Sequence, residues 1–224
     1  MEGRCISYCR YQEAEEIFER IQEYGLKDTR ENRQYLLLER AIFKRTKKEI
    51  SYSDSLALLQ EALDCTLSRK EQEKIESCFL TCQEAHVLNN MAIAYYRIGE
   101  KEKAIKLLQS IIKNFESSRI DLRYHTRALQ PVFSNLASYL EETGNYDNSL
   151  AICKKAILLA FQIGKGKNFQ RYLTTKACVL EDQGKRDESI ECFTQAFYVS
   201  CLMKDEVKAE LIKNHLKESF LVML

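Results

Sequence analysis

The chain contains an internal repeat, and this feature constrains its fold more than any other. Three glycines, Gly99, Gly144 and Gly184, lie in the similar segments YYRIGEKEKAI, YLEETGNYDNSL and VLEDQGKRDESI. Residues of similar size recur at matching distances before and after each glycine. A pattern that recurs every few tens of residues indicates stacked structural units, each of which buries its apolar face against its neighbours.

The aligned positions alternate large and small side chains at helical spacing. Before the glycine the copies read Leu88-x2-Met91-Ala92-x2-Tyr95, Phe133-x2-Leu136-Ala137-x2-Leu140 and Leu173-x2-Lys176-Ala177-x2-Leu180. After it they read Ala104-x3-Leu108-x2-Ile111, Ser149-x3-Cys153-x2-Ala156 and Ser189-x3-Phe193-x2-Ala196. Small residues let two helices approach closely, and glycine accepts the tight turn between them. The pattern is typical of tetratricopeptide (TPR) helical hairpins.

Two weaker copies precede the three clear ones, and neither has the glycine in register. One reads Ser55-x3-Leu59-x2-Ala62 and the other reads Ala14-x3-Phe18-x2-Ile21. The 224 residues include only seven glycines and one proline, which favours an all-α protein. We predict one repeat domain with hairpins near residues 1–24, 31–64, 76–114, 123–162 and 168–200, and closing helices within 201–224.

The three glycines are 45 and 40 residues apart, which exceeds the usual TPR period of about 34 residues. We therefore expect lengthened helices or connections. Pro131 lies in one such extension, where it either kinks a long helix or marks the start of a shorter one. The first copy lacks most of its first helix. This favours a chain that is the C-terminal portion of a longer protein, although a natural start is the alternative.

Charge and hydropathy exclude several classes of protein. The 34 basic and 33 acidic residues give a formal charge of +1, which argues against a broad nucleic-acid surface. Apolar runs are too short to cross a bilayer, and the N-terminus lacks the core of a signal peptide. The nine cysteines are odd in number and scattered, as expected in a reducing compartment. We expect a cytoplasmic protein with no membrane partner.

No pattern indicates a metal, a cofactor or a catalytic site. Cys78, Cys82 and His86 are spaced i, i+4, i+8, but eight residues of helix span about 12 Å, too far for one shared ion. His125 and His215 have no ligand-spaced neighbours. The segment Ile163 to Phe169, IGKGKNF, lacks the spacing of a phosphate-binding loop. We predict that the chain is not an enzyme and has no cofactor.

The first helix of each pair lines the concave surface of a stacked array. Register places on it Arg40, Lys44, Asn89, Asn90, Ile93, Tyr96, Arg97, Ser134, Asn135, Ser138, Glu141, Arg171, Thr174, Cys178 and Glu181. Asparagine offers both a donor and an acceptor, which suits the backbone of an extended peptide. The candidate peptide-binding residues are Asn89, Asn90, Ile93, Tyr96, Arg97, Ser134, Asn135, Ser138, Arg171 and Thr174.

The sequence leaves alternatives open at several of these positions. Asn90 and Asn135 share one repeat position, where asparagine either holds a ligand or bonds neighbouring helices. Asn89 lies one step round the helix, toward the concave side. Arg97 and Arg171 are either ligand anchors or ordinary surface charges, which rarely have a special task.

Two longer segments resemble a known family. FLTCQEAHVLNNMAIAYYRIGEKEKAIKLLQSII and FSNLASYLEETGNYDNSLAICKKAI are similar to the C-terminal sensor domain of the RRNPP group, Gram-positive regulators that include Rgg-like and PlcR-like proteins. The matching phrases are Leu80-Thr81-x-x-Glu84, Asn89-Asn90-x-Ala92 and Asn135-Leu136-x-x-Tyr139-Leu140. The likeness runs from about Tyr11 to Phe220.

This resemblance implies a right-handed superhelix of about five hairpins with a concave peptide groove. It implies quorum sensing of a short signalling peptide, homodimerisation, and DNA binding only through an N-terminal helix-turn-helix domain, which this sequence lacks. The family's groove asparagines correspond to Asn90 and Asn135, with Asn89 beside them. We therefore expect the peptide-binding regulatory domain of a transcription regulator, with the final helices as its dimer surface. The alternative is a TPR scaffold that joins two proteins without a signalling peptide.

Overall fold

The computed structural model describes residues 27–118, 120–162 and 168–221, and within these ranges it is helical and has no strand. The elements are α2 (Arg30–Thr46), α3 (Tyr52–Asp64), α4 (Arg69–Gln72), α5 (Cys82–Arg97), α6 (Lys101–Ser117), η1 (Leu122–His125), α7 (Thr126–Glu142), α8 (Tyr146–Gln162), α9 (Phe169–Asp182), α10 (Arg186–Leu202) and α11 (Glu206–Phe220). The prediction of an all-α repeat fold is confirmed. The hairpin predicted near residues 1–24 lies outside the described residues.

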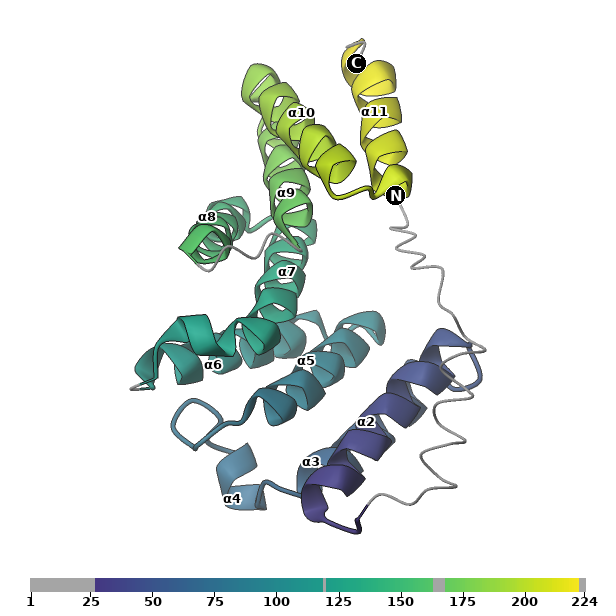
Figure 1. The fold of residues 1–224 in the computed structure, drawn as a ribbon, viewed down its shortest axis with the longest axis vertical. Helices are drawn as coiled ribbons and strands as arrows, with labels where there is room; N and C mark the ends of the chain where they lie inside the picture. Colours follow the sequence, from purple (N-terminus) through teal and green to yellow (C-terminus); the bar gives the residue numbers. More distant parts are fainter. Residues whose placement is uncertain (1–26, 119, 163–167, 222–224) are drawn as a thin grey trace.

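The helices pack as consecutive pairs, α2–α3, α5–α6, α7–α8 and α9–α10 (Figure 1). The second helix of each pair also packs against the first helix of the next pair, and α10 packs against α11 in the same way. Figure 1 shows α2 and α3 at one end of the molecule and α10 and α11 at the other. The first helices α2, α5, α7 and α9 therefore follow one another along one side of the stack, as in a superhelical repeat.

The turn between paired helices has a left-handed residue at a fixed place. Gly99, Gly144 and Gly184 have φ of 96°, 75° and 72°, and each stands two residues before the next helix. Glycine populates this region freely because it has no Cβ. After α10 the same place is taken by Lys204, with φ of 56°. The turn is therefore a property of the repeat, and glycine is its preferred residue.

After α2 the left-handed residue is Lys48, with φ of 60°, and α3 begins four residues later at Tyr52. This turn is two residues longer than the glycine turns, so counting back from Ser55 gives the wrong register for α2. Arg45, three residues before the left-handed position, is equivalent to Tyr96. The prediction that Arg40 and Lys44 hold the concave register is corrected accordingly.

Small residues at the centre of each pair allow a contact between helix backbones. The Ser149 hydroxyl donates to the Ala137 carbonyl at 2.8 Å, and the Ser189 hydroxyl donates to the Ala177 carbonyl at 2.9 Å. All four residues are fully buried. Serine therefore satisfies two requirements at once, since it is small enough for close packing and its buried hydroxyl has an acceptor.

The first helix of the first clear copy, α5, begins with a capping box. The Thr81 hydroxyl accepts from the Glu84 backbone N–H at 3.2 Å, and the Glu84 carboxylate accepts from the Thr81 backbone N–H at 2.7 Å. Each side chain satisfies a backbone group that the helix leaves unpaired. The Leu80-Thr81-x-x-Glu84 phrase thus fixes where α5 starts.

Pro131 lies inside α7, so the helix begins before the proline, at Thr126. Proline has no N–H and leaves the carbonyl four residues earlier, that of Arg127, without its helical partner. His86 Nε2, from α5, lies 3.1 Å from the Arg127 oxygen and donates to it. The histidine replaces the missing bond and joins α5 to α7.

Because paired helices approach closely, the effect of an Ala→Leu substitution on stability should depend strongly on its position. Ala137→Leu adds volume where the side chain is fully buried against α8, and should lower the free energy of unfolding by about 1–3 kcal/mol. The matched control is Ala151→Leu at an exposed position of α8, expected within about 0.5 kcal/mol of the parent chain. Urea unfolding measures both. Equal effects at the two positions would contradict the packing described above.

Candidate functional site

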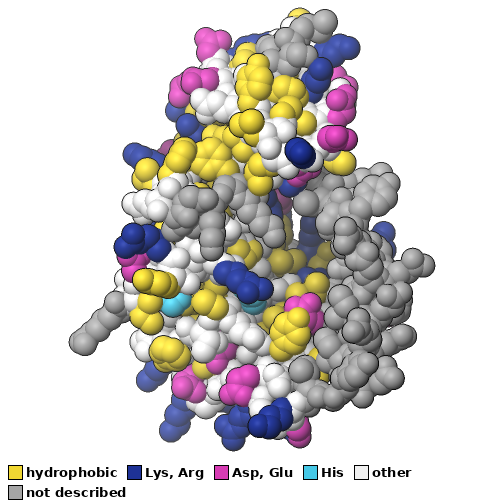
Figure 2. Space-filling model, viewed as in Figure 1, with side chains coloured by type: hydrophobic (Ala, Val, Ile, Leu, Met, Phe, Trp, Pro, Cys, Tyr) yellow, Lys and Arg dark blue, Asp and Glu magenta, His cyan; other side chains and the backbone are white. Residues whose placement is uncertain are grey.

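The inner face carries a chain of hydrogen bonds across three successive first helices. Asn135 Nδ2 of α7 donates to Asn89 Oδ1 of α5 at 3.0 Å, and Arg171 Nη2 of α9 donates to Asn135 Oδ1 at 3.2 Å. Asn89 and Asn135 are 4% and 7% exposed. Within the described residues the Asn89 amide nitrogen donates no hydrogen bond. Figure 2 shows both hydrophobic and basic side chains near the middle of the described part of this face.

Asn90 makes a second connection, between α5 and α2. Its Oδ1 accepts from Arg45 Nη2 at 2.8 Å, and its Nδ2 donates to the His86 carbonyl one turn earlier at 3.0 Å. Asn90 and Asn135 therefore both bond a neighbouring helix, which is one of the two roles left open by the sequence. Their role in holding a ligand stays a prediction.

Arg45 belongs to this site although the sequence did not single it out. Its guanidinium also lies 3.4 Å from the Ser55 hydroxyl and 5.7 Å from the centre of the Tyr52 ring. Burial lowers the pKa of Arg45, and the neighbouring Tyr52 and Tyr139 oppose this shift. Arg45 could have been identified only from the left-handed turn at Lys48, and the residue types around that turn do not reveal it.

Two tyrosines stack beside the asparagines. The rings of Tyr96 and Tyr139 have centroids 3.6 Å apart and planes 6° from parallel. The Tyr96 hydroxyl donates to Glu142 Oε2 at 2.8 Å. Burial raises the pKa of both phenols, that of Tyr139 to about 12, so both stay protonated near neutral pH. The pair forms a rigid aromatic wall that joins α5 and α7.

Acidic groups gather near the C-terminal ends of α7 and α9. Burial, together with the nearby charges of Asp182 and Glu142, raises the pKa of Glu141 to about 7. Glu181 contacts His215 of α11 through a 2.9 Å pair between Oε2 and Nε2. The inner face thus has an arginine-rich part near the asparagines and an acidic part beside it.

The remaining predicted residues differ in how far they are exposed to solvent. Ile93, Ser138 and Thr174 are half-buried, and the Thr174 hydroxyl donates to the Gln170 carbonyl of its own helix at 2.8 Å. Arg97 is exposed. Ser134 is only 1% exposed, so it is enclosed and does not line the concave surface as predicted. Its hydroxyl has no hydrogen-bond partner among the described residues.

The histidines and cysteines considered as metal ligands have other contacts. Cys82 Sγ lies 3.7 Å from His125 Nδ1, and Cys78 Sγ lies 3.6 Å from the Ile75 carbonyl oxygen. In the part of the chain that the structure describes, no three metal-ligating side chains come together. In that same part, no helix has both the length and the hydropathy needed to cross a membrane.

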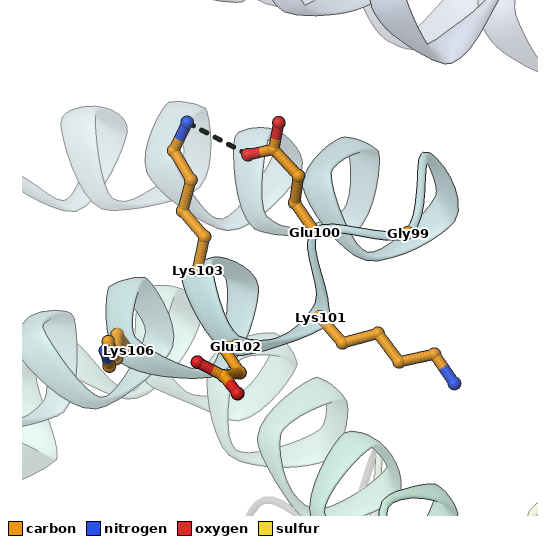
Figure 3. Close-up of a pocket in the computed structure, with 6 residues that line it drawn as sticks. All are labelled: Gly99, Glu100, Lys101, Glu102, Lys103 and Lys106. Carbon is orange, nitrogen blue, oxygen red and sulfur yellow. Dashed lines mark ion pairs between the residues drawn. The ribbon is translucent and has the colours of Figure 1, made fainter.

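A surface hollow of about 670 Å³ lies outside the inner face, at the turn between α5 and α6. Figure 3 shows that its lysines diverge, with Lys101 and Lys103 pointing in different directions. Lys103 Nζ is paired with Glu100 Oε2 at 3.1 Å. The hollow is a shallow notch of one turn and has no converging polar groups.

Comparison with known proteins places the chain in a family. A family model described as the RNPP family C-terminal domain matches residues 3–222. No curated protein matches the sequence. Among solved structures, PlcR of Bacillus thuringiensis in complex with the peptide PapR7 and DNA has a TM-score of 0.75 and 18% identity, covering 92% of this chain and 69% of its own.

Two further structures are similar. ComR of S. thermophilus, in complex with DNA and its signalling peptide ComS, has a TM-score of 0.67 and 18% identity over 91% of this chain and 65% of its own. A putative kinesin light chain of Podospora anserina with TPR-like repeats has a TM-score of 0.59 and 16% identity over 87% of this chain and 89% of its own. At these identities the likeness shows the fold alone.

The raised pKa of Glu141 predicts a pH dependence of stability. Its folded pKa is about 7, above the usual value of 4.5, so the folded state binds a proton more tightly than the unfolded state. The chain should therefore lose stability as pH rises from about 4.5 to 7. Glu141→Gln should unfold at higher urea than the parent at pH 8, and the difference should shrink toward pH 5. The matched control is Glu188→Gln, at an exposed position of α10. A difference between the Glu141 variant and the parent that is constant from pH 5 to 8 would contradict the assignment.

Proposed function

The chain belongs to the family of RNPP C-terminal domains, and from this membership we propose that it is the peptide-binding regulatory domain of a cytosolic transcription regulator. A short signalling peptide would lie along the inner face formed by α2, α5, α7 and α9. Binding would shift the population between two arrangements of a dimer, without any chemical step.

The observation that carries this proposal is the row of asparagines on the inner face. Side-chain amides from α5 and α7 meet there, and Asn89 Nδ2 has no partner within the described residues. An amide donates and accepts at once, which is what an extended backbone requires whatever its side chains. The stacked Tyr96 and Tyr139 lie on the same helices and add apolar area. The PlcR and ComR structures, which are complexes with the peptides PapR7 and ComS, support the same interpretation.

We assign no catalytic step to the domain. Burial raises the pKa of the Cys178 thiol on α9 to about 12, which disfavours the reactive thiolate. Cys153 of α8 has its pKa raised to about 12 for the same reason. These thiols behave as small apolar side chains.

Peptide binding is tested by calorimetry with short synthetic peptides drawn from the secretome of the source organism. Asn90→Ala and Asn135→Ala should each weaken the binding of an active peptide by about tenfold or more, which corresponds to about 1.4 kcal/mol. Asn148→Ala, at an exposed position of α8, is the matched control and should leave affinity unchanged. Circular dichroism checks that the variants stay folded. Unchanged affinity in both inner-face variants would remove the site. Failure of every peptide, with capture of a protein partner, would favour the scaffold alternative.

We also propose that the domain forms a homodimer through α10 and α11. Leu202 of α10 is 83% exposed and Leu211 of α11 is 58% exposed, and Tyr198 and Val207 lie one turn away on the same two helices. Figure 2 shows hydrophobic side chains gathered over these helices. Exposed apolar patches of this kind mark interaction surfaces.

The dimer surface is tested by light scattering after size-exclusion chromatography. Leu202→Glu and Leu211→Glu should shift the chain from dimer to monomer, because each places a charge in an apolar contact. Leu158→Glu on α8, where leucine is 53% exposed, is the matched control and should stay dimeric. A dimer that survives both α10 and α11 variants would exclude this surface.

A further inference from the structure

A second hollow, of about 400 Å³, lies between the connection from α4 to α5 and the C-terminal end of α6. The residues that line it include 76–80, then Asn114 and Phe115 of α6, and His125 of η1. None of the described lining residues belongs to α2, α5, α7 or α9, so the hollow is separate from the inner face. Its volume falls within the range of about 300–1,000 Å³ that is usual for small-molecule sites.

The walls of this hollow are largely apolar. Leu80 and Phe115 are buried and form part of its lining. The His125 ring packs against the Phe115 ring, with centroids 4.5 Å apart. Phe79 is 77% exposed and Ile120 is 46% exposed, and both also line the hollow. Large apolar side chains that stay exposed beside a hollow are typical of a site that an apolar group enters.

Asn114 supplies a polar group whose orientation is fixed. Its side-chain Nδ2 donates to the Ile75 carbonyl at 2.6 Å and to the Cys78 carbonyl at 2.7 Å. A carbonyl oxygen only accepts, so the atom of the amide that faces both carbonyls must be the nitrogen. These two bonds hold the amide in place and leave its Oδ1 for another partner.

The Asn114 oxygen is both unpaired and accessible. Oδ1 accepts no hydrogen bond within the described residues, although the residue is only 6% exposed. The enclosed side-chain atoms without a partner in that part of the chain are His125 Nε2, Ser134 Oγ and Gln183 Oε1. Asn114 Oδ1 is not among them, and the hollow that Asn114 lines gives access to it. One free acceptor in a largely apolar hollow is the kind of group that orients a bound ligand.

The charges around the hollow favour a neutral ligand. Glu76 is the one acidic side chain among the described lining residues, and its carboxylate is paired with Lys113 of α6. Burial lowers the pKa of His125, so its ring is uncharged near neutral pH. A charged ligand would lose its hydration without gaining a free counter-charge, and a neutral one avoids this cost.

We propose that this hollow binds a small, neutral aromatic molecule that carries one O–H or N–H group. The ring of the ligand lies against Phe79, Phe115 and His125, since aromatic rings pack favourably in offset or edge-to-face arrangements. Its O–H or N–H group donates to Asn114 Oδ1. The site shares no residue with the proposed peptide site, so the two proposals stand or fall separately.

The test compares three aromatic probes that differ in their capacity to donate. p-Cresol has an O–H donor, toluene has none, and 4-methylanisole has an oxygen that carries no hydrogen. Titration of the 224-residue chain, followed by NMR of the probes, gives their affinities. We expect p-cresol to bind about three- to tenfold more tightly than either other probe, which is the net effect of one hydrogen bond. Equal affinity of p-cresol and toluene, or no binding of p-cresol, would overturn the proposal.

Two variants locate the bound probes. Phe79→Ala should weaken p-cresol and toluene about threefold or more, and it should fold normally because most of the Phe79 side chain is exposed. Phe161→Ala is the matched control, since Phe161 of α8 is 69% exposed and lies outside the hollow, and it should leave both affinities unchanged. Unchanged p-cresol affinity in Phe79→Ala would place the probe elsewhere and remove the site.

Asn114→Ala tests the acceptor directly. It should bind p-cresol no more tightly than toluene, because the oxygen that receives the donor is gone. The substitution also leaves the Ile75 and Cys78 carbonyls unpaired. Where that prevents folding, the comparison of the three probes on the parent chain decides the question. A folded Asn114→Ala variant that keeps the full preference for p-cresol would exclude Asn114 as the acceptor and overturn the proposal.

Discussion

The hydrogen bond from Asn135 to Asn89 fixes how two successive inner helices sit against each other. Both side chains are almost fully buried, so breaking the bond strands an amide away from water at about 1–3 kcal/mol. The same placement of α5 and α7 brings the Tyr96 and Tyr139 rings into their stack. It also presents the Asn135 oxygen to Arg171 on the next helix. The amides thus hold the inner helices together before any ligand is considered.

The helical pairs are visible in the sequence because local rules produce them. Gly99, Gly144 and Gly184 mark the left-handed turns, and the small residues around them mark the close contacts. The first described pair was harder to place, since Lys48 occupies the left-handed position and its turn is two residues longer. Residue types do not predict a left-handed conformation for a lysine. Counting back from Ser55 therefore gives the wrong register for α2, and Arg45 is not identified. The position of Pro131 within its helix could not be predicted for a similar reason. The carbonyl that the proline leaves unpaired is bonded by His86, which comes from another helix.

The residues of the site could be predicted from the sequence, whereas the hydrogen bonds between them could not. Register alone placed Asn89, Asn90 and Asn135 on the inner helices. Which atoms meet depends on the stagger between helices, and the pairs Arg45–Asn90 and Arg171–Asn135 join residues 45 and 36 positions apart. Such contacts arise from tertiary packing, which overrides local pattern. Ser134 occupies the repeat position of Asn89, and tertiary packing encloses its side chain.

Binding of a peptide backbone at the inner-face amides would be linked to the hydrogen bonds that these amides already make. The Asn90 and Asn135 oxygens that a peptide backbone N–H would seek are already taken by Arg45 and Arg171. A peptide that binds these oxygens would therefore exchange places with both guanidinium groups. Because Arg45 and Arg171 come from α2 and α9, the exchange alters contacts on both sides of α5 and α7, and so gives a bound peptide a physical means to change how the repeats are arranged.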